Sequence, residues 1–270
     1  MPGDLRTAWL ANIRLHPIKG LDPVSVPEAR IGPNGGLELD RVWVLLSVDG
    51  QWINGKRTAT IHHIRAEYDP LVSMVTLSVS GGAKKSNGLR PTRFAFPTDY
   101  EPAAAWFSEY FDQTVLVRHI REGLPDDGLA PGPTIVSTAS LQAVCELFPE
   151  IELHEARERF RATLEVDGVP AFWEDQLFSE RENYPVRFKI GEVAFEGSNP
   201  CARCPVPPRN PRTGDDLIGF QKKFSEMRRA GLPATSPAVR FDHFYHLSTN
   251  TRVPGTEQGK LLRVGDALVL

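Results

Sequence analysis

Residues 197–214 read GSNPCARCPVPPRNPRTG and form the most unusual stretch of this sequence. Five prolines, three arginines and two cysteines fall within these 18 residues. Because prolines fix the backbone and remove hydrogen-bond donors, a proline-dense loop after a strand is stiff, which suits a segment that holds a reactive group in place. Arg203 precedes Cys204, and a guanidinium close to a thiol favours the thiolate, the form that binds metals and attacks electrophiles.

Three functional interpretations of the pair Cys201 and Cys204 are open at this point. Half of a zinc site needs two further ligands, but Cys145 falls in a helix expected to face the core, and the spacing of His243 and His246 is slightly short. A redox dithiol is expected at the start of a helix, which the prolines directly after the pair disfavour. A single thiolate ligand to a cofactor metal needs only one cysteine in a rigid loop. A pair of thiols that only packs as small apolar groups is the fourth, non-functional interpretation.

The composition bounds the class of protein. A chain of 270 residues exceeds the usual ~100–200 residues of one domain, so we expect two compact units, or one large unit with an elaborated N-terminal half. The 31 Lys and Arg residues do not exceed the 34 Asp and Glu residues, which disfavours a nucleic-acid-binding protein. The apolar runs are too short for membrane spans, and the N-terminus lacks the apolar stretch of a secretory signal. These features predict a cytoplasmic protein that does not bind membranes.

Short runs of β-branched and aromatic residues, separated by Gly and Pro turns, predict a β-rich chain. The expected strands of the first half are residues 9–15, 24–31, 42–48, 71–79 and 114–118. A helix is expected over 101–112, where Pro102 suits the first turn. The acidic, Gly- and Pro-rich residues 122–133 carry no period and predict the boundary between two halves.

The second half is expected to combine strands with helices. We expect strands at 135–137, 160–166, 186–190 and 193–195, helices at 138–147 and 215–230, and a closing strand pair. Arg157, Arg159 and Arg161 alternate as on the face of a strand, but a solvated face with neighbouring Glu155 and Glu158 explains at least Arg157 better. His62 and His63 adjoin a strand and a turn, and we assign them no role.

Several of these segments together resemble one protein family. The loop from Cys201 to Gly214, with Arg159-Phe-Arg161 and Trp173-Glu-Asp175 before it, is similar to the core of the MOSC domain, named after the C-terminal domain of molybdenum cofactor sulfurase. The segments 16–20 (HPIKG), 35–36 (GG), 40–43 (DRVW) and 55–64 (GKRTATIHHI) resemble the β-barrel-like module that precedes this domain. The resemblance extends from about residue 9 to residue 270 and includes the amidoxime-reducing branch of the family.

The resemblance implies a β-rich α+β fold, with a β-barrel-like N-terminal module over residues 1–125 and a MOSC β-barrel with flanking helices over residues 126–270. It also implies a pyranopterin molybdenum cofactor whose metal takes one protein thiolate. Carried over residue by residue, Cys204 is the metal ligand and catalytic, and Asp175 is either a proton donor or substrate contact, or a helix cap or surface acid. The implied cofactor-binding residues are Lys19, Arg41, Ser137, Thr138, Arg161 and Arg203. Lys and Arg donors and hydroxyls at a helix start are what an anionic cofactor needs.

The function implied is reduction of N-hydroxylated small molecules. The chain departs from the family pattern at Gly20, at Ala162-Thr163 and at Ala202, each of which removes a polar side chain, so a non-enzymatic cofactor carrier or storage protein is the alternative. Sulfur transfer through a persulfide on Cys204 is a third hypothesis, although no pyridoxal-phosphate domain is present to mobilise sulfur. The cysteines are too few for an iron–sulfur cluster beside the metal ligand, which predicts an external electron-transfer partner of the ferredoxin, flavodoxin or cytochrome type.

Overall fold

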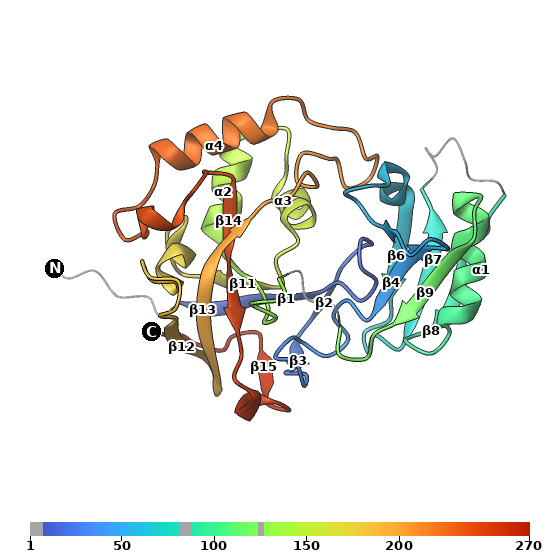
Figure 1. Ribbon diagram of the computed structural model, residues 1–270, viewed down its shortest axis with the longest axis horizontal. Coiled ribbons are helices and arrows are strands. Elements are labelled where there is room, and N and C mark those ends of the chain that lie inside the picture. Colours follow the sequence, from blue (N-terminus) through green and yellow to red (C-terminus); the bar gives the residue numbers. More distant parts are fainter. Residues whose placement is uncertain (1–7, 81–87, 124–126) are drawn as a thin grey trace.

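The computed structural model describes residues 8–80, 88–123 and 127–270 and places them in two lobes that lie side by side (Figure 1). The strands are β1 (Trp9–Leu15), β2 (Val24–Val26), β3 (Glu28–Arg30), β4 (Trp43–Ser47), β5 (Trp52–Ile53), β6 (Ile64–Tyr68), β7 (Met74–Val79), β8 (Thr92–Ala95), β9 (Val115–His119), β10 (Ile135–Ser137), β11 (Leu164–Asp167), β12 (Val186–Ile190), β13 (Val193–Ala202), β14 (His246–Arg252), β15 (Leu261–Arg263) and β16 (Leu268–Val269). The α-helices are α1 (Tyr100–Phe111), α2 (Thr138–Leu147), α3 (Leu153–Phe160) and α4 (Phe220–Ala230). Short 3-10 helices are η1 (Ala59–His63), η2 (Trp173–Leu177), η3 (Ala238–Arg240) and η4 (Gly255–Glu257). These elements confirm the β-rich α+β class.

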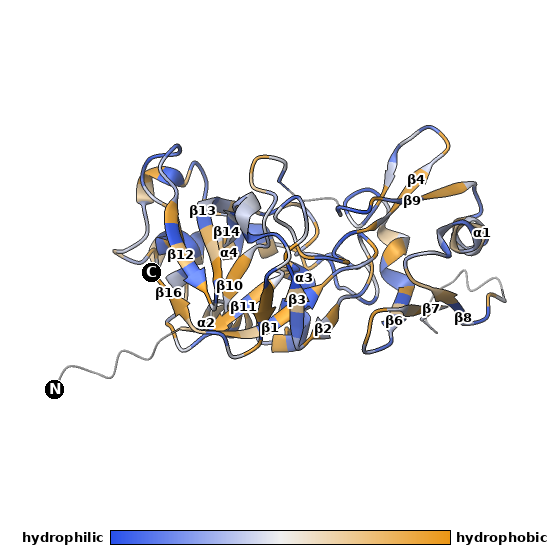
Figure 2. Ribbon diagram, turned by 90° about the horizontal axis from the view of Figure 1, so that it is seen from below, coloured by the Kyte–Doolittle hydropathy of each residue, from blue (hydrophilic) through white to orange (hydrophobic). Residues whose placement is uncertain are grey.

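An eight-stranded sheet forms the larger lobe, in the order β16-β12-β13-β14-β10-β11-β1-β2. All pairs are antiparallel except β10 and β11. An isolated antiparallel bridge joins Trp9 to Ala267, and the Leu268 amide donates to the Ala8 carbonyl at 2.7 Å. These contacts bring the β16 end of the sheet against β1, but a single isolated bridge and this hydrogen bond do not close the sheet into a barrel. In Figure 2 its strands alternate between apolar and polar residues, as expected where one face is buried.

The N-terminal strands belong to the larger lobe. β1 pairs with β11, where Ile13 is opposite Leu164, and β3 pairs with β15. The expected strand over 24–31 is divided at Pro27, and its two parts pair with different strands, β2 with β1 and β3 with β15. The boundary predicted between residues 125 and 126 lies outside the described residues, as do residues 1–7, on which the expectation of no secretory signal partly rests.

The smaller lobe consists of two three-stranded antiparallel sheets, β5-β4-β9 and β6-β7-β8, with α1 packed beside β9. Helix α1 buries Ala103, Trp106, Phe107 and Tyr110, which recur at helical spacing and explain why this segment is helical. Trp43 is fully buried, and its indole N–H donates to the Pro97 carbonyl at 2.9 Å. This lobe fixes the segments around Lys19 and Arg41.

Helices α2, α3 and α4 pack on the larger lobe and bury an apolar cluster that is separate from the main core. Phe148 stacks on Phe220 at a centroid distance of 4.5 Å, and Phe160 and Phe224 pack against the same group. The Ser137 hydroxyl accepts from the Ser140 amide at 3.1 Å and so caps α2 at its predicted start. Among the described residues, no helix combines the length and apolar character needed to cross a bilayer.

Four predictions are wrong in the extent or the pairing of an element. The strand expected over 160–166 begins at Leu164, and the residues before it form helix α3, because Ala156 and Phe160 are buried at helical spacing. The strand expected at 193–195 extends to Ala202, with register shifts at 197–199 and 200–202 that accommodate Pro200. The helix expected from residue 215 begins only at Phe220. The expected closing strands do not pair with each other, since β15 pairs with β3 and β16 with β12.

Candidate functional site

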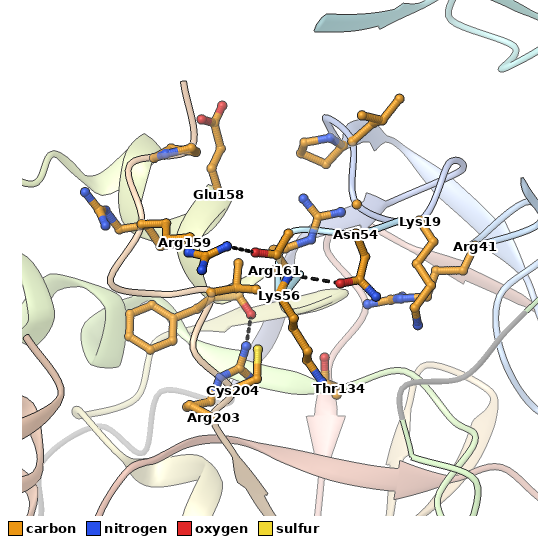
Figure 3. Close-up of a pocket in the computed structure, with 18 of the residues that line it drawn as sticks. Lys19, Arg41, Asn54, Lys56, Thr134, Glu158, Arg159, Arg161, Arg203 and Cys204 are labelled. Atoms are coloured by element: carbon orange, nitrogen blue, oxygen red, sulfur yellow. Dashed lines mark hydrogen bonds between the residues drawn. The ribbon is translucent and has the colours of Figure 1, made fainter. Parts of the chain in front are cut away.

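A cavity of about 470 Å³ is lined by segments from both halves of the chain. The first half contributes residues 19–23, 41, 54–56, 61–62 and 64–65, and the second half contributes, among others, 158–161, 201–204 and 209. Figure 3 shows Lys19 and Arg41 on one side, with Arg203 and Cys204 on the other. The volume is in the range of small-molecule sites, which is roughly 300–1,000 Å³. Five residues that the sequence singles out line this cavity together: Lys19, Arg41, Arg161, Arg203 and Cys204.

The two cysteines occupy the end of strand β13 and the turn after it. Cys201 is the next-to-last residue of the strand, and Cys204 follows the strand end by two residues. The Arg203 amide donates to the Tyr245 carbonyl at 2.9 Å, which attaches the turn to the segment before β14. The Arg203 guanidinium donates to the Cys201 sulfur at 3.1 Å and also to the Phe160 carbonyl. The Arg203 guanidinium thus contacts the sulfur of Cys201, and Cys204 is partly buried at the cavity wall.

The alternative roles of the cysteine pair gain no support from the geometry. Cys145, Cys201 and Cys204 are all free thiols, and Cys145 does not line the cavity. Burial raises the pKa of the Cys145 thiol, which makes it less reactive. Within the described ranges, the one group of three potential metal ligands contains neither of the paired cysteines.

Lys19 and Arg41 are held beside each other by a short parallel pairing. Residues 16–19 run alongside 41–43, since the Arg41 amide donates to the His16 carbonyl at 2.9 Å and the Lys19 amide donates to the Trp43 carbonyl at 2.8 Å. Asp40 links the two segments, because one of its carboxylate oxygens accepts from the His16 amide at 2.6 Å and the other from the Arg41 guanidinium. Arg41 itself has a positive φ of 54°. The HPIKG and DRVW motifs thus form one structural unit.

Arg161 reaches the cavity because it ends a helix. It is the C-cap residue of α3, with a left-handed φ of 55°. Arg159, expected on the same strand face, instead lies in α3 and binds Glu155 at 2.6 Å and the Pro207 carbonyl at 2.8 Å. Arg157 binds Glu165 at 2.7 Å. The three arginines therefore differ in role, and Arg161 is the one on the helix cap.

The cavity has a positive electrostatic character. Its basic lining residues are Lys19, Arg41, Lys56, Arg65, Arg159, Arg161, Arg203 and Arg209, and its acidic ones are Asp22, Asp127 and Glu158. Asp22 pairs with Arg65 at 3.0 Å, and Glu158 pairs with Arg212 at 2.7 Å. His16 is fully buried, and burial together with the charges of Arg161 and Arg41 lowers its pKa well below the usual value. The positive field explains why an anion is favoured here.

Two groups of lining residues escape the sequence analysis. His62 lines the cavity from η1, and burial, followed by the charges of Arg161 and Arg209, lowers its pKa to about 4. The segment Asn54–Lys56 lies over the cavity in a turn, where the Asn54 side chain accepts from the Lys56 amide at 3.0 Å. The stretch GKRTATIHHI is part of the family resemblance and could have pointed to both. Gly214 approaches η1 closely, because a Cβ there would lie 2.8 Å from the Ala59 carbonyl.

Ser137, Thr138 and Asp175 do not line this cavity. Ser137 caps α2, and the Thr138 hydroxyl donates to Glu165 at 2.9 Å. Asp175 is buried in η2, where Arg228 and Ser236 bind its carboxylate at 2.8 and 2.6 Å. All three are buried and hydrogen-bonded elsewhere in the larger lobe, and their predicted roles stay predictions.

The family model described as MOSC N-terminal beta barrel domain matches residues 7–114, and the MOSC domain model matches residues 133–269. The chain is 26% identical over 204 residues to molybdenum cofactor sulfurases of Drosophila pseudoobscura pseudoobscura and Drosophila persimilis, covering 67% of this chain but only 25% of theirs. The chain thus spans about a quarter of the length of those curated relatives. It is 22% identical over 249 residues to mitochondrial amidoxime-reducing component 1 of Danio rerio, covering 77% of this chain and 71% of that one.

A comparison of folds finds the YuaD protein of Bacillus subtilis, at 12% identity and a TM-score of 0.35, with 97% of this chain and 94% of that one covered. A score this low carries no argument about the site. The two family models, in contrast, include the segments named above that line the cavity, in both halves of the chain. The chain belongs to the MOSC domain family.

Proposed function

We propose that the cavity binds a pyranopterin molybdenum cofactor, with which the protein reduces N-hydroxylated small molecules. The observation that carries the proposal is the convergence of Lys19, Arg41, Arg161 and Cys204 on one cavity, from segments far apart in the sequence. The relatives named molybdenum cofactor sulfurase support the proposed cofactor, and the relative named for amidoxime reduction supports the proposed reaction.

The residues present fit such a cofactor. Its phosphate needs charge-assisted donors, which the lysine and arginine side chains of the lining provide in excess over carboxylates. Two of the three acidic lining residues, Asp22 and Glu158, already bind Arg65 and Arg212. Sulfur is a suitable soft ligand for the metal, and Cys204 lines the cavity wall.

The roles of the chain follow from these positions. Cys204 would hold the metal, and Lys19, Arg41 and Arg161 would hold the anionic end of the cofactor. Arg203 fixes the cysteine turn through its bonds to Phe160 and Tyr245. When bound, the cofactor supplies a two-electron redox centre for cleaving an N–O bond. His62 is neutral near pH 7, so it adds a hydrogen-bonding group to the wall without adding charge.

Cofactor retention provides the first test. The wild type, Cys204→Ala and the matched control Cys201→Ala are purified from a host that makes the cofactor, and molybdenum is measured per chain. We expect near-stoichiometric metal in the wild type, loss in the Cys204 variant, and at least partial retention in the Cys201 variant. Zinc or no metal in the wild type contradicts the proposal, and equal loss in both variants indicates a two-thiolate site.

Turnover provides the second test. With a strong artificial one-electron donor, the loaded protein is expected to convert an amidoxime to its amidine without a partner protein, since two electrons and two protons release the oxygen as water. NADH or NADPH alone should give no turnover, because the sequence has no G-x-G-x-x-G after a strand. In the cell we propose an external electron-transfer protein of the ferredoxin, flavodoxin or cytochrome type as the donor. Full occupancy without reduction of any N-oxygenated compound would instead favour a carrier.

A further inference from the structure

We propose that Asp242, His243 and His246 form a second metal site, separate from the cavity, for a divalent first-row transition ion of the zinc class. One ligand atom of each residue lies within 4.8 Å of those of the other two. Asp242 Oδ1 is 3.8 Å from Nε2 of both histidines, and the two imidazole rings stack with centroids 4.2 Å apart. None of the three residues lines the cavity.

The histidine on β14 is already oriented as a metal ligand. His246 Nδ1 lies 2.9 Å from the His243 backbone carbonyl, and a carbonyl can only accept, so the ring proton belongs on Nδ1. The lone pair therefore lies on Nε2, which is the atom near Asp242. A backbone carbonyl that fixes the tautomer of a histidine is the usual support of a metal-binding imidazole. Phe241 packs edge-on against the ring at 5.5 Å and limits its rotation.

The local charges allow a cation to bind. Asp242 is exposed and supplies the negative charge, while His246 is largely buried and supplies a ring nitrogen. The nearest facing cation is Arg228, which donates to the His246 carbonyl at 3.2 Å. Its charge is offset by Asp175 at 2.8 Å. Arg229 lies over the Phe244 ring at 5.1 Å. Arg240 donates to the Ser179 carbonyl at 2.7 Å and lies over the Phe178 ring at 5.7 Å.

The donor set indicates which ion fits. Two imidazole nitrogens and one carboxylate oxygen favour zinc and its neighbours over magnesium or calcium, which prefer all-oxygen sites. His243 is half-exposed and can move, but its Nδ1 accepts from the Tyr245 amide at 3.1 Å. Binding through Nε2 of His243 requires that bond to be given up. The affinity is therefore lower than in a four-ligand structural site, and a coordination position is left for water.

The position of the site gives it a structural role. His246 pairs with Ala202 across β13 and β14, and Tyr245 accepts from the Arg203 amide. An ion joining Asp242, His243 and His246 would brace the start of β14, against which the cysteine turn rests. This inference does not depend on the cofactor in the cavity.

The test titrates the full chain with Zn²⁺ by calorimetry and with Co²⁺ by absorption spectroscopy. We expect one Zn²⁺ per chain, a rise in the unfolding temperature, and Co²⁺ ligand-field bands without the charge-transfer absorption of a thiolate. Asp242→Asn and His243→Gln, both at exposed or half-exposed positions, should each weaken binding roughly tenfold or more without unfolding the protein.

Two controls separate this site from other metal-binding groups. The first control is His154, an exposed histidine that lies 3.2 Å from the Glu152 carboxylate. Because this pair contains one histidine rather than two, His154→Gln should leave Zn²⁺ binding unchanged. The double variant Cys201→Ala/Cys204→Ala should also bind Zn²⁺ normally. Loss of binding only in the double cysteine variant, or equal binding in all variants, would overturn the proposal.

Discussion

Replacing Glu174 with Gln should remove a large part of the pH dependence of stability. The Glu174 side chain is fully buried in η2, one of its oxygens accepts from the Ser140 hydroxyl at 2.9 Å, and Asp175 is next to it. Burial first, and then the charge of Asp175, raise its pKa from 4.5 to about 7. The folded protein therefore keeps this proton at pH values where the unfolded chain has lost it.

The sign and size of the effect follow from linkage. A raised pKa contributes stability that is fully present below pH 4.5 and is lost as the pH rises through about 7. At 1.36 kcal/mol for each pH unit, the whole contribution is about 3 kcal/mol, of which about 2.5 kcal/mol is lost between pH 5 and pH 8.

Urea unfolding of the wild type and of Glu174→Gln at pH 5 and pH 8 measures this difference. Between these two pH values the wild type should lose about 2.5 kcal/mol more than the variant, because the buried histidines contribute equally to both proteins. Glu150→Gln, at an exposed position, is the matched control and should follow the wild type. Parallel pH profiles for the wild type and Glu174→Gln would show that this carboxyl is ionised in the fold at pH 5, and the reasoning would fail.

Three further predictions concern the cavity and the sheet. Lys19→Ala and Arg41→Ala should each lower cofactor affinity by roughly ten- to a hundredfold, the loss of a charge-assisted hydrogen bond, and molybdenum content at limiting cofactor measures this. Unchanged content in both variants would show that neither side chain holds the cofactor. Gly197→Ala should destabilise the fold by roughly 3 kcal/mol or more in urea unfolding, because its Cβ would lie 1.6 Å from the Leu177 carbonyl, while Gly255→Ala has open space and serves as control. His62→Gln should flatten the acid side of the stability profile, since its pKa of about 4 lies below the usual 6.5 and its contribution is lost as the pH falls from 6.5 towards 4; a wild-type-like slope over that range would contradict this.

The sequence predicts best those elements whose signal is local. Helix α2 begins and ends where expected, because a serine cap precedes its apolar pattern and Phe148-Pro149 follows it. The predicted helix over 101–112 is shifted by one residue in the structure, where α1 spans Tyr100–Phe111. Strand β9 is likewise shifted by one residue. In each case the periodicity alone is enough to define the element.

The elements that the sequence misplaces depend on contacts far along the chain. Three alternating arginines resemble the face of a strand. This segment is nevertheless helix α3, because Ala156 and Phe160, four residues apart, are both buried. Strand β13 extends through Pro200 to Ala202 because it pairs with β14. The local sequence does not indicate this pairing. Proline there disfavours a strand interior, and only the register shifts beside it permit one.

The candidate site shows the same division. The motifs around Lys19, Arg41, Arg161 and Cys204 identify residues that line one cavity. The contribution of His62 depends on how η1 packs against the loop at Gly214, which no local pattern contains. The polar side chains of Ser137 and Asp175 do not line the cavity. They form hydrogen bonds with buried partners within the larger lobe.

The pairing of β1 with β11 determines when this protein can fold during its synthesis. Ile13 leaves the ribosome long before its partner Leu164 exists, and at about 5–20 residues per second the first strand waits on the order of ten seconds for it. During that time β2 is available to pair with one edge of β1, but the edge that binds β11 stays open in the nascent chain, which slows folding and exposes that edge to wrong partners. A fragment that lacks β1 has the corresponding problem at β11. A piece limited to the MOSC domain match, residues 133–269, would leave β11 as an open sheet edge and should aggregate when expressed alone, although the family boundary suggests a self-sufficient unit.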